Sequence, residues 1–126
     1  MLRVYLAGPD VFLPDALAQA ERKKRLCAQY GFEGVFPLDK SLDLTRLSSH
    51  EAGLAIAEGN ERMMRACDLA VANATPFRGP SIDPGTAYEM GFMRALGKPV
   101  FAYANLPGPY LDRVEAHFGR PLERVG

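Results

Sequence analysis

Short apolar runs alternate along the chain with longer stretches in which apolar residues recur at helical spacing. Each apolar run is bounded by glycine, proline or polar residues, which is typical of a buried strand. The predicted strands are residues 2–8, 34–38, 68–74 and 99–104. The predicted helices span residues 14–30, 84–96 and 110–118, and a further helix runs from Ser48 to about Ala66. The remaining stretches, 39–48 and 75–83, are predicted to be connections.

Local signals mark several helix ends. Ser48 and Glu51 form an S-x-x-E capping box. Asp83 followed by Pro84 is typical of an N-cap with proline at the first helical position, where its missing N–H has no cost. Gly31 is suited to end the first helix.

Strands that alternate with helices predict an α/β fold, with a parallel sheet and helices on both faces. Ligands of such sheets bind in the crevice beyond the carboxyl ends of the strands. We therefore expect functional residues in the segments YLAGPDVF, FPLDKS, VANATPFRGPSID and YANLPGP.

Composition limits the classes of partner and the location that the protein can have. The 126 residues predict one domain over 1–126, and 15 basic and 15 acidic residues give no net field for nucleic acid or an anionic membrane. Cys27 and Cys67 match no metal-ligand spacing and are expected to be small buried residues. No signal peptide or apolar run of roughly 18 residues is visible, so a cytoplasmic location is expected.

Known nucleotide signatures are absent from the sequence. There is no G-x-x-x-x-G-K-[ST] and no G-x-G-x-x-G, so neither a P-loop nor a dinucleotide site is predicted. His50 and His117 lie in or beside predicted helices, away from the predicted crevice. No cofactor and no metal are expected.

The stretch PSIDPGTAYEMG contains the strongest candidate chemistry. Helix capping explains Asp83 but not Gly85, because glycine in a first turn costs up to about 1 kcal/mol relative to alanine. Glu89 follows on an otherwise apolar helix, on the same face as Gly85 and Thr86. A carboxylate on such a helix is either paired structurally or functional, and the pattern leaves both open.

Three more polar residues interrupt apolar patterns. Tyr5 lies inside the first strand and needs a polar partner when buried. Asp68 opens the third strand, and Asn60 breaks the apolar stripe of its helix; each is either a site residue or a boundary residue. Paired carboxylates without histidine or metal suit glycosidic bond cleavage, with Glu89 and either Asp68 or Asp83 as the pair.

The segments VYLAGPDVF and CDLAVANATPFRGPSIDPGTAYEMGFMRALGKPVFAY resemble the nucleoside 2-deoxyribosyltransferases over most of residues 3–104. The pattern D-x-G-T-A-x-E-x-G is the specific part. The resemblance implies a flavodoxin-like domain with a sheet of four to five strands and a dimer-based homo-oligomer. It also implies transfer of 2-deoxyribose between purine and pyrimidine bases, without a cofactor.

The resemblance also implies roles for single residues. Glu89 would be the nucleophile that forms a covalent deoxyribosyl intermediate, with retention of configuration, and Tyr5 would orient its carboxylate. Asp83 would bind the sugar hydroxyls and Asp68 would recognise or protonate the base. Further substrate-binding residues would be Gly8, Pro9, Phe12 and the loop residues Phe77, Arg78 and Gly79.

One family feature is missing and two rival functions stay open. Family members usually continue into an Asp-Asn-hydrophobic motif that binds the sugar 5′-hydroxyl, so either the sequence is incomplete or the site is finished differently; Asn105 is not equivalent. A nucleoside 5′-monophosphate N-glycosidase would use Arg78 and Ser81 for the phosphate, although Asp10 would repel it. A non-catalytic nucleotide-binding module would keep Glu89 as a structural acid.

Overall fold

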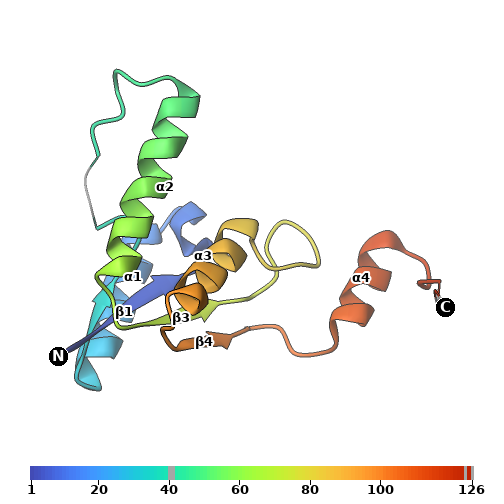
Figure 1. The fold of residues 1–126 in the computed structure, drawn as a ribbon. Helices are drawn as coiled ribbons and strands as arrows, with labels where there is room; N and C mark the ends of the chain where they lie inside the picture. Colours follow the sequence, from blue (N-terminus) through green and yellow to red (C-terminus); the bar gives the residue numbers. More distant parts are fainter. Residues whose placement is uncertain (40–41, 124, 126) are drawn as a thin grey trace.

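The computed structural model describes residues 1–39, 42–123 and 125. Four parallel strands form one sheet in the order β2-β1-β3-β4 (Figure 1). This order is that of the first four strands of a flavodoxin-like sheet. The predicted α/β fold with a parallel sheet is therefore confirmed. The strands are β1 (Leu2–Ala7), β2 (Phe32–Val35), β3 (Leu69–Asn73) and β4 (Val100–Tyr103).

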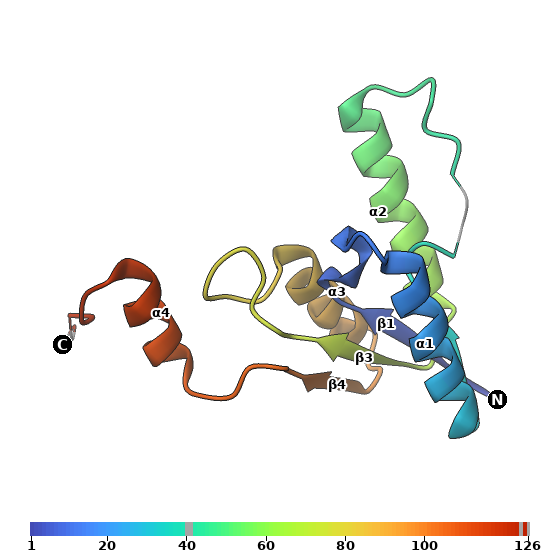
Figure 2. The same cartoon turned by 180° about the vertical axis from the view of Figure 1, so that it is seen from behind.

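Helices lie on both faces of the sheet, as predicted. One helix, α1 (Ala16–Gln29), covers one face, and α2 (Ser49–Arg65) and α3 (Pro84–Ala95) cover the other (Figures 1 and 2). A short 3₁₀ helix, η1 (Pro9–Phe12), follows β1 directly. The last helix, α4 (Tyr110–Phe118), lies away from the sheet in both views.

Alternation along β1 separates the two halves of the core, because successive strand side chains point to opposite faces. Val4 and Leu6 pack with Ala20 of α1 on one face. Tyr5 and Ala7 face the other way, in the cluster formed with α2 and α3. The buried members contributed by these two helices and the residue after α2 are Met63, Met64, Cys67 and Met93. The Tyr5 hydroxyl is thereby directed to the face that carries Glu89.

The predicted helix caps are confirmed. Ser48 Oγ accepts a hydrogen bond of 3.1 Å from the Glu51 backbone N–H. Asp83 Oδ2 accepts bonds of 2.9 Å from the Thr86 N–H and 3.0 Å from its hydroxyl, and Pro84 is the first residue of α3. Gly31 follows the C-cap of α1 with a φ of 81°, a conformation that favours glycine.

One strand and one cysteine differ from the prediction. β2 starts at Phe32 and ends at Val35, whereas the sequence predicted 34–38. The chain turns after Val35 because Asp39 Oδ2 accepts a 2.8 Å bond from the Phe36 N–H, and Pro37 has no N–H to continue a strand. Cys67 is buried as predicted, whereas Cys27 is only half-buried.

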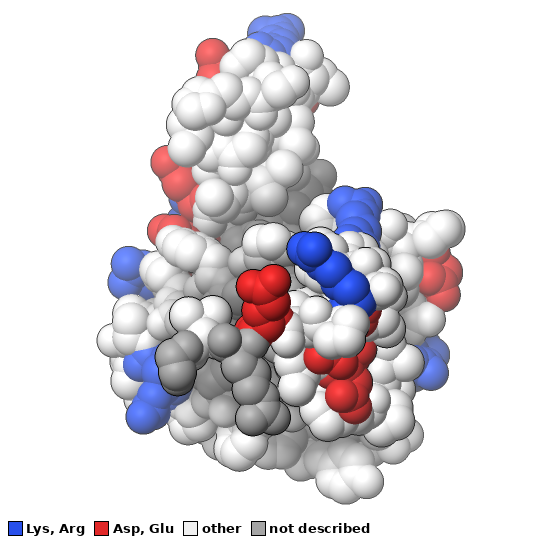
Figure 3. Space-filling model, turned by 90° about the vertical axis from the view of Figure 1, so that its right-hand side faces the viewer, with Lys and Arg blue, Asp and Glu red and all other residues white. Residues whose placement is uncertain are grey.

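The surface carries no strong field on the face toward α4. Figure 3 shows acidic and basic side chains interspersed there, and the part of the molecule that rises above the sheet is mostly uncharged. In Figure 1 the N-terminal half of α2 forms this projection. No helix in the described part of the chain combines the length and apolar character needed to cross a membrane.

Candidate active site

A pocket of about 380 Å³ lies beyond the carboxyl ends of the strands, where the fold predicts a ligand site. Its walls come from the turn after β1, the segment after β2, the side of α2 and the first turns of α3. The lining residues are Gly8, Val11, Phe12, Pro37, Leu38, Gly53, Ile56, Ala57, Asn60, Met64, Asp83, Gly85, Tyr88 and Glu89. Most of this surface is apolar, and the polar groups are few.

Glu89 is the most buried carboxylate in this pocket, with 9% of its surface exposed. The hydroxyl of Tyr5, which is itself fully buried, donates a short hydrogen bond to Glu89 Oε2. Burial raises the pKa of Glu89 from 4.5 to about 7; Tyr5 opposes this rise, and the nearby charge of Asp83 adds to it. The pKa of Tyr5 is also raised, chiefly by burial and then by Glu89, so the phenol stays protonated and acts as donor.

Asp83 has a second function available besides capping α3. Both bonds from Thr86 go to Oδ2, and no hydrogen bond among the described residues uses Oδ1. Asp83 lines the pocket beside Glu89 and also a smaller hollow of about 340 Å³ formed by residues 77–84. One carboxylate oxygen is therefore free to accept a bond from a ligand hydroxyl.

An aromatic pair links two loops at the rim of the pocket. The rings of Phe12 and Phe77 stack with centroids 5.6 Å apart and an interplanar angle of 16°. The Arg78 guanidinium lies over both rings, 5.1 Å from the centroid of Phe12 and 4.6 Å from that of Phe77. The structure thus brings together Phe12 with Phe77 and Arg78, and places Gly79 beside them in the smaller hollow.

Two predicted site residues lie elsewhere. Asp68 precedes β3, at the amino end of the sheet, where its Oδ2 accepts a 2.7 Å bond from the Arg3 N–H and its own N–H donates to the Arg3 carbonyl at 2.8 Å. It does not line the pocket, because the pocket lies at the opposite, carboxyl end of the strands. Pro9 is buried in η1 and is likewise absent from the lining, whereas Asn60 belongs to it.

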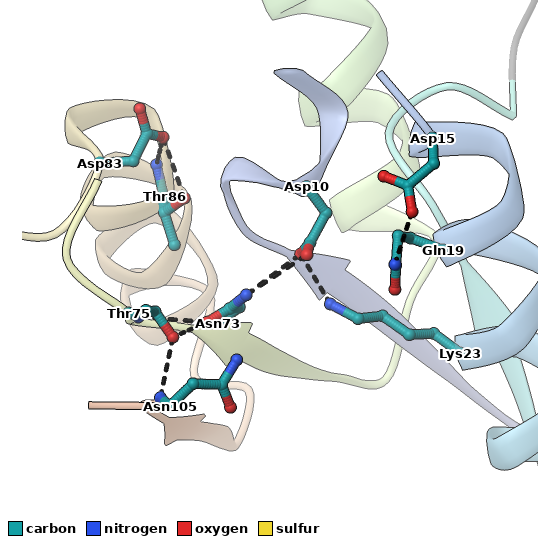
Figure 4. A network of polar contacts seen from close by, with 9 residues as sticks. All are labelled: Asp10, Asp15, Gln19, Lys23, Asn73, Thr75, Asp83, Thr86 and Asn105. Carbon is teal, nitrogen blue, oxygen red and sulfur yellow. Dashed lines mark hydrogen bonds and ion pairs between the residues drawn. The ribbon is translucent and has the colours of Figure 1, made fainter. Parts of the chain in front are cut away.

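A polar network behind the pocket was not predicted (Figure 4). Asp10 pairs with Lys23 of α1 at 2.6 Å and accepts long bonds of 3.4 Å from the Asn73 amide. Asn73 Oδ1 accepts from the Thr75 N–H at 3.1 Å, and Thr75 Oγ1 accepts a 2.9 Å bond from the Asn105 N–H. The network joins the ends of β1, β3 and β4. Its sequence signal was the position of Asp10 and Asn73 within the predicted crevice segments.

Sequence reasoning also missed most of the wall provided by α2. The lining residues of this helix follow the spacing i, i+3, i+4, i+7 and i+11, which marks one helix face. They are Gly53, Ile56, Ala57, Asn60 and Met64. The signal was present as a stripe of small and apolar residues interrupted by a single amide.

Gly8 permits the close contact between the pocket turn and the polar network. A Cβ at Gly8 would lie 2.7 Å from Asp10 Oδ2 and 2.8 Å from Asn73 Cβ. We expect Gly8→Ala to lower the free energy of unfolding by about 1–3 kcal/mol, as overpacking does. Urea denaturation measures this effect.

Gly91→Ala is the matched control for Gly8→Ala, because Gly91 lies within α3 and nothing described lies within 4 Å of its added Cβ. It should stabilise the protein by up to about 1 kcal/mol, since alanine is the better helix former. Equal stability of Gly8→Ala and the wild type would contradict the packing around Gly8.

Other parts of the surface offer less chemistry. A larger hollow of about 690 Å³ lies beside α1 and is lined by no carboxylate. Within residues 1–39, 42–123 and 125, no three His, Cys, Asp or Glu side chains gather in a way suited to a metal ion. The pocket with Glu89 is therefore the candidate active site.

Fold and site together define a class: an open parallel α/β domain with a buried, hydrogen-bonded carboxylate at the carboxyl edge of its sheet. The model of the nucleoside 2-deoxyribosyltransferase family matches residues 4–124. The chain belongs to this family.

Solved structures are similar to this chain. A 2-deoxyribosyltransferase from Leishmania mexicana has 28% identity and a TM-score of 0.77, covering 98% of this chain and 75% of that one. A 2-deoxyribosyltransferase from Bacillus psychrosaccharolyticus shares the fold, with 20% identity and a TM-score of 0.68 over 91% of this chain and 81% of that one.

A curated relative is also similar. An uncharacterized protein of Schizosaccharomyces pombe is 36% identical over 116 residues, which cover 90% of this chain and 55% of the relative. The chain thus spans about half the length of that relative.

Proposed function

We propose that this protein transfers 2-deoxyribose from one purine or pyrimidine base to another. The observation that carries the proposal is the Glu89 carboxylate, buried in an apolar pocket and held by the Tyr5 hydroxyl. Family membership and the similarity to the 2-deoxyribosyltransferase from Leishmania mexicana support the same reaction. The substrates would be small deoxynucleosides and free bases.

Glu89 would act as the nucleophile in a two-step reaction. Its carboxylate oxygen attacks C1′ of the sugar, and the electron pair of the C1′–N bond leaves with the base. The resulting deoxyribosyl ester is then attacked at C1′ by a second base on the face that the first one left. Two inversions give net retention of configuration.

Tyr5 would fix the direction of this attack. Because its hydroxyl donates to Oε2, the Oε1 atom is left to approach the sugar. The same bond stabilises the ionised form of Glu89 against the cost of burial. The nucleophile is thereby charged over the upper part of the neutral pH range.

Asp83 would hold the sugar next to Glu89. Its Oδ1 is free to accept a bond from a sugar hydroxyl, while Oδ2 stays committed to the first turn of α3. A bond to a fixed helix N-cap restricts the position of the sugar ring, and such positioning contributes to the rate. Asp68 has no part in this proposal, because it lies at the other end of β3.

A hydrolase is the second candidate function. The hollow beside Asp83 contains Arg78 and Ser81, which are suited to contact a 5′-phosphate. A nucleoside 5′-monophosphate would then give its sugar to water instead of to a second base. Ser81 Oγ is bonded to the Tyr110 hydroxyl at 2.8 Å, so this hollow is supported from α4.

The products distinguish transfer from hydrolysis. We expect thymidine and adenine, incubated with the protein, to yield deoxyadenosine and thymine by chromatography. Release of free deoxyribose without a new nucleoside would replace the transferase by the hydrolase, and deoxynucleoside 5′-monophosphates are the matched substrates for that case. Failure to turn over any of these compounds would favour the third alternative, a non-catalytic nucleotide-binding module.

Assembly and location complete the proposal. The family resemblance favours a dimer-based homo-oligomer acting in the cytoplasm. Light scattering coupled to size-exclusion chromatography measures the first of these, and a monomer at micromolar concentration would contradict it.

A further inference from the structure

One face of the sheet is only partly covered by helices. On this face α1 packs against β2 and η1, and Figure 2 shows β4 to the side of α1, with no helix in front of it. Leu6, Val71 and Phe101 occupy paired positions of β1, β3 and β4 on the same face. A hollow of about 690 Å³ lies between α1 and this part of the sheet. Its volume is within the range of small-molecule sites.

The floor and the rim of this hollow differ in chemical character. The floor is apolar and aromatic, with Leu6, Val71 and the ring of Tyr103. The rim includes Arg22 and Arg25, which are exposed and lie about one helical turn apart on α1. No carboxylate of the described residues lines the hollow. Positive charge therefore borders an apolar surface.

The positive charges of α1 differ in whether they are already paired. Lys23 Nζ lies 2.6 Å from Asp10 Oδ2, and Lys24 also pairs with an aspartate. The side chains of Arg22 and Arg25 form no ion pair or hydrogen bond with any residue that the structure describes. A guanidinium group binds a carboxylate or a phosphate through two parallel N–H donors. Two such groups at this spacing are suited to hold one acid group.

We propose that this hollow is a second binding site, which takes a small compound with a flat apolar body and one acid group. The body lies against Val71 and Tyr103. The acid, a carboxylate or a phosphate, is bound by Arg22 and Arg25. The candidate active site disfavours the same compound, because the carboxylate of Asp83 lines it. The proposal is independent of the proposed function, since none of the residues that form the hollow lines the candidate active site.

Three matched aromatic probes test the requirement for an acid group. We expect 2-naphthoate or 2-naphthyl phosphate to bind the protein in calorimetry, and the neutral 2-naphthamide to bind about 10-fold more weakly or less, because charged groups form the stronger hydrogen bonds. Binding of either acid supports the site, and the tighter of the two identifies the acid group. An amide that binds as tightly as the acids would overturn the proposal, and so would no binding of either acid.

Methionine variants test the two arginines, because methionine keeps an unbranched side chain and removes the charge. Arg22→Met and Arg25→Met together should weaken binding of the tighter acid by about 30-fold or more. Arg94→Met is the matched control, since Arg94 is exposed on α3 and does not line the hollow. Its affinity should stay within about twofold of the wild type. Unchanged affinity in the double variant, or an equal loss in Arg94→Met, would overturn the proposal.

Cys27 reports the position of the bound acid. Its thiol is half-buried and lines the hollow, whereas Cys67 is buried on the other face of the sheet. Because access controls thiol reactivity, a saturating acid should slow alkylation of Cys27 by iodoacetamide about 5-fold or more. Peptide mapping by mass spectrometry measures this rate. An unchanged rate would place the acid elsewhere on the protein and overturn the proposal.

Discussion

Glu89→Gln is expected to lower kcat for deoxyribosyl transfer by about 10⁴-fold or more, because the amide is not a nucleophile. Glutamine has nearly the same shape and retains an oxygen that accepts the bond from Tyr5. The fold should therefore survive, and the loss of activity measures the chemical role of the carboxylate. Initial rates of base exchange with thymidine and adenine provide the readout.

Glu61→Gln is the control for this loss. Glu61 lies on α2 and accepts a bond from Tyr88, but it does not line the pocket. Its substitution should leave kcat within a factor of about three. A Glu89→Gln protein that kept more than about one-hundredth of wild-type activity would refute the nucleophile assignment, since nucleophile loss costs far more.

The covalent intermediate has a direct test in the same protein. A 2-fluoro-arabinosyl nucleoside should slow breakdown of the ester, so that intact-protein mass shows an adduct and peptide mapping places it on Glu89. An adduct on another residue would move the nucleophile elsewhere. Glu89→Ala distinguishes the enzyme from a non-catalytic binding module. Such a module would keep its affinity for nucleosides, whereas the enzyme would lose turnover.

The buried Glu89 carboxylate makes the stability of the protein depend on pH. The direction of its pKa shift gives the pH range over which stability is lost. The pKa is raised from 4.5 to about 7, so the folded protein binds the proton more tightly than the unfolded chain does. The associated stabilisation is complete below 4.5 and is lost as the pH rises through 7, and it amounts to about 3 kcal/mol at 1.36 kcal/mol per unit. Glu89→Gln should therefore lose less stability than the wild type between pH 5 and 8.

Tyr5→Phe is expected to reduce kcat by about 100-fold and to shift the pH profile upward. The wild-type rate should rise with pH through about 7, because the ionised carboxylate attacks and the pKa of Glu89 lies there. The bond from Tyr5 lowers that pKa, so its removal raises it further. The pH dependence of kcat/KM locates the midpoint in each protein.

Tyr30→Phe is the control for the loss of a hydroxyl. Tyr30 is exposed at the end of α1, and its variant should match the wild type in both rate and midpoint. A Tyr5→Phe midpoint below that of the wild type, or an unchanged rate and midpoint, would contradict the proposed interaction. A fall in rate with an unchanged midpoint would leave Tyr5 a purely geometric role.

Much of the fold could be predicted because local signals and tertiary packing agree. The alternation in β1 that sends Tyr5 and Val4 to opposite faces is a period-2 pattern, and the Asp83–Pro84 start of α3 has its own cap chemistry. The predicted range of β2 was displaced because the strand ends at a turn fixed by Asp39, and periodicity does not encode such a side-chain contact.

The site was harder to predict because it depends on register between elements. Asp68 is close in sequence to the pocket strand, but a residue before β3 lies at the amino edge, a full strand length from the carboxyl edge. The face of α2 that lines the pocket was recognisable as a stripe, yet only the packing of α2 beside α3 shows that the stripe surrounds a cavity. The role of a residue such as Asp10 depends on partners from other segments, which the local sequence does not indicate.

The division of the pocket between two helices has a consequence for protein engineering. α2 and α3 belong to separate crossovers, and each is fixed to the sheet by its own buried residues, Met64 in one and Met93 in the other. Residues on the exposed turns of α2 can therefore be exchanged while the α3 carboxylates keep their positions. A library confined to Gly53, Ile56, Ala57 and Asn60 would change the α2 wall of the pocket and leave the α3 carboxylates in place.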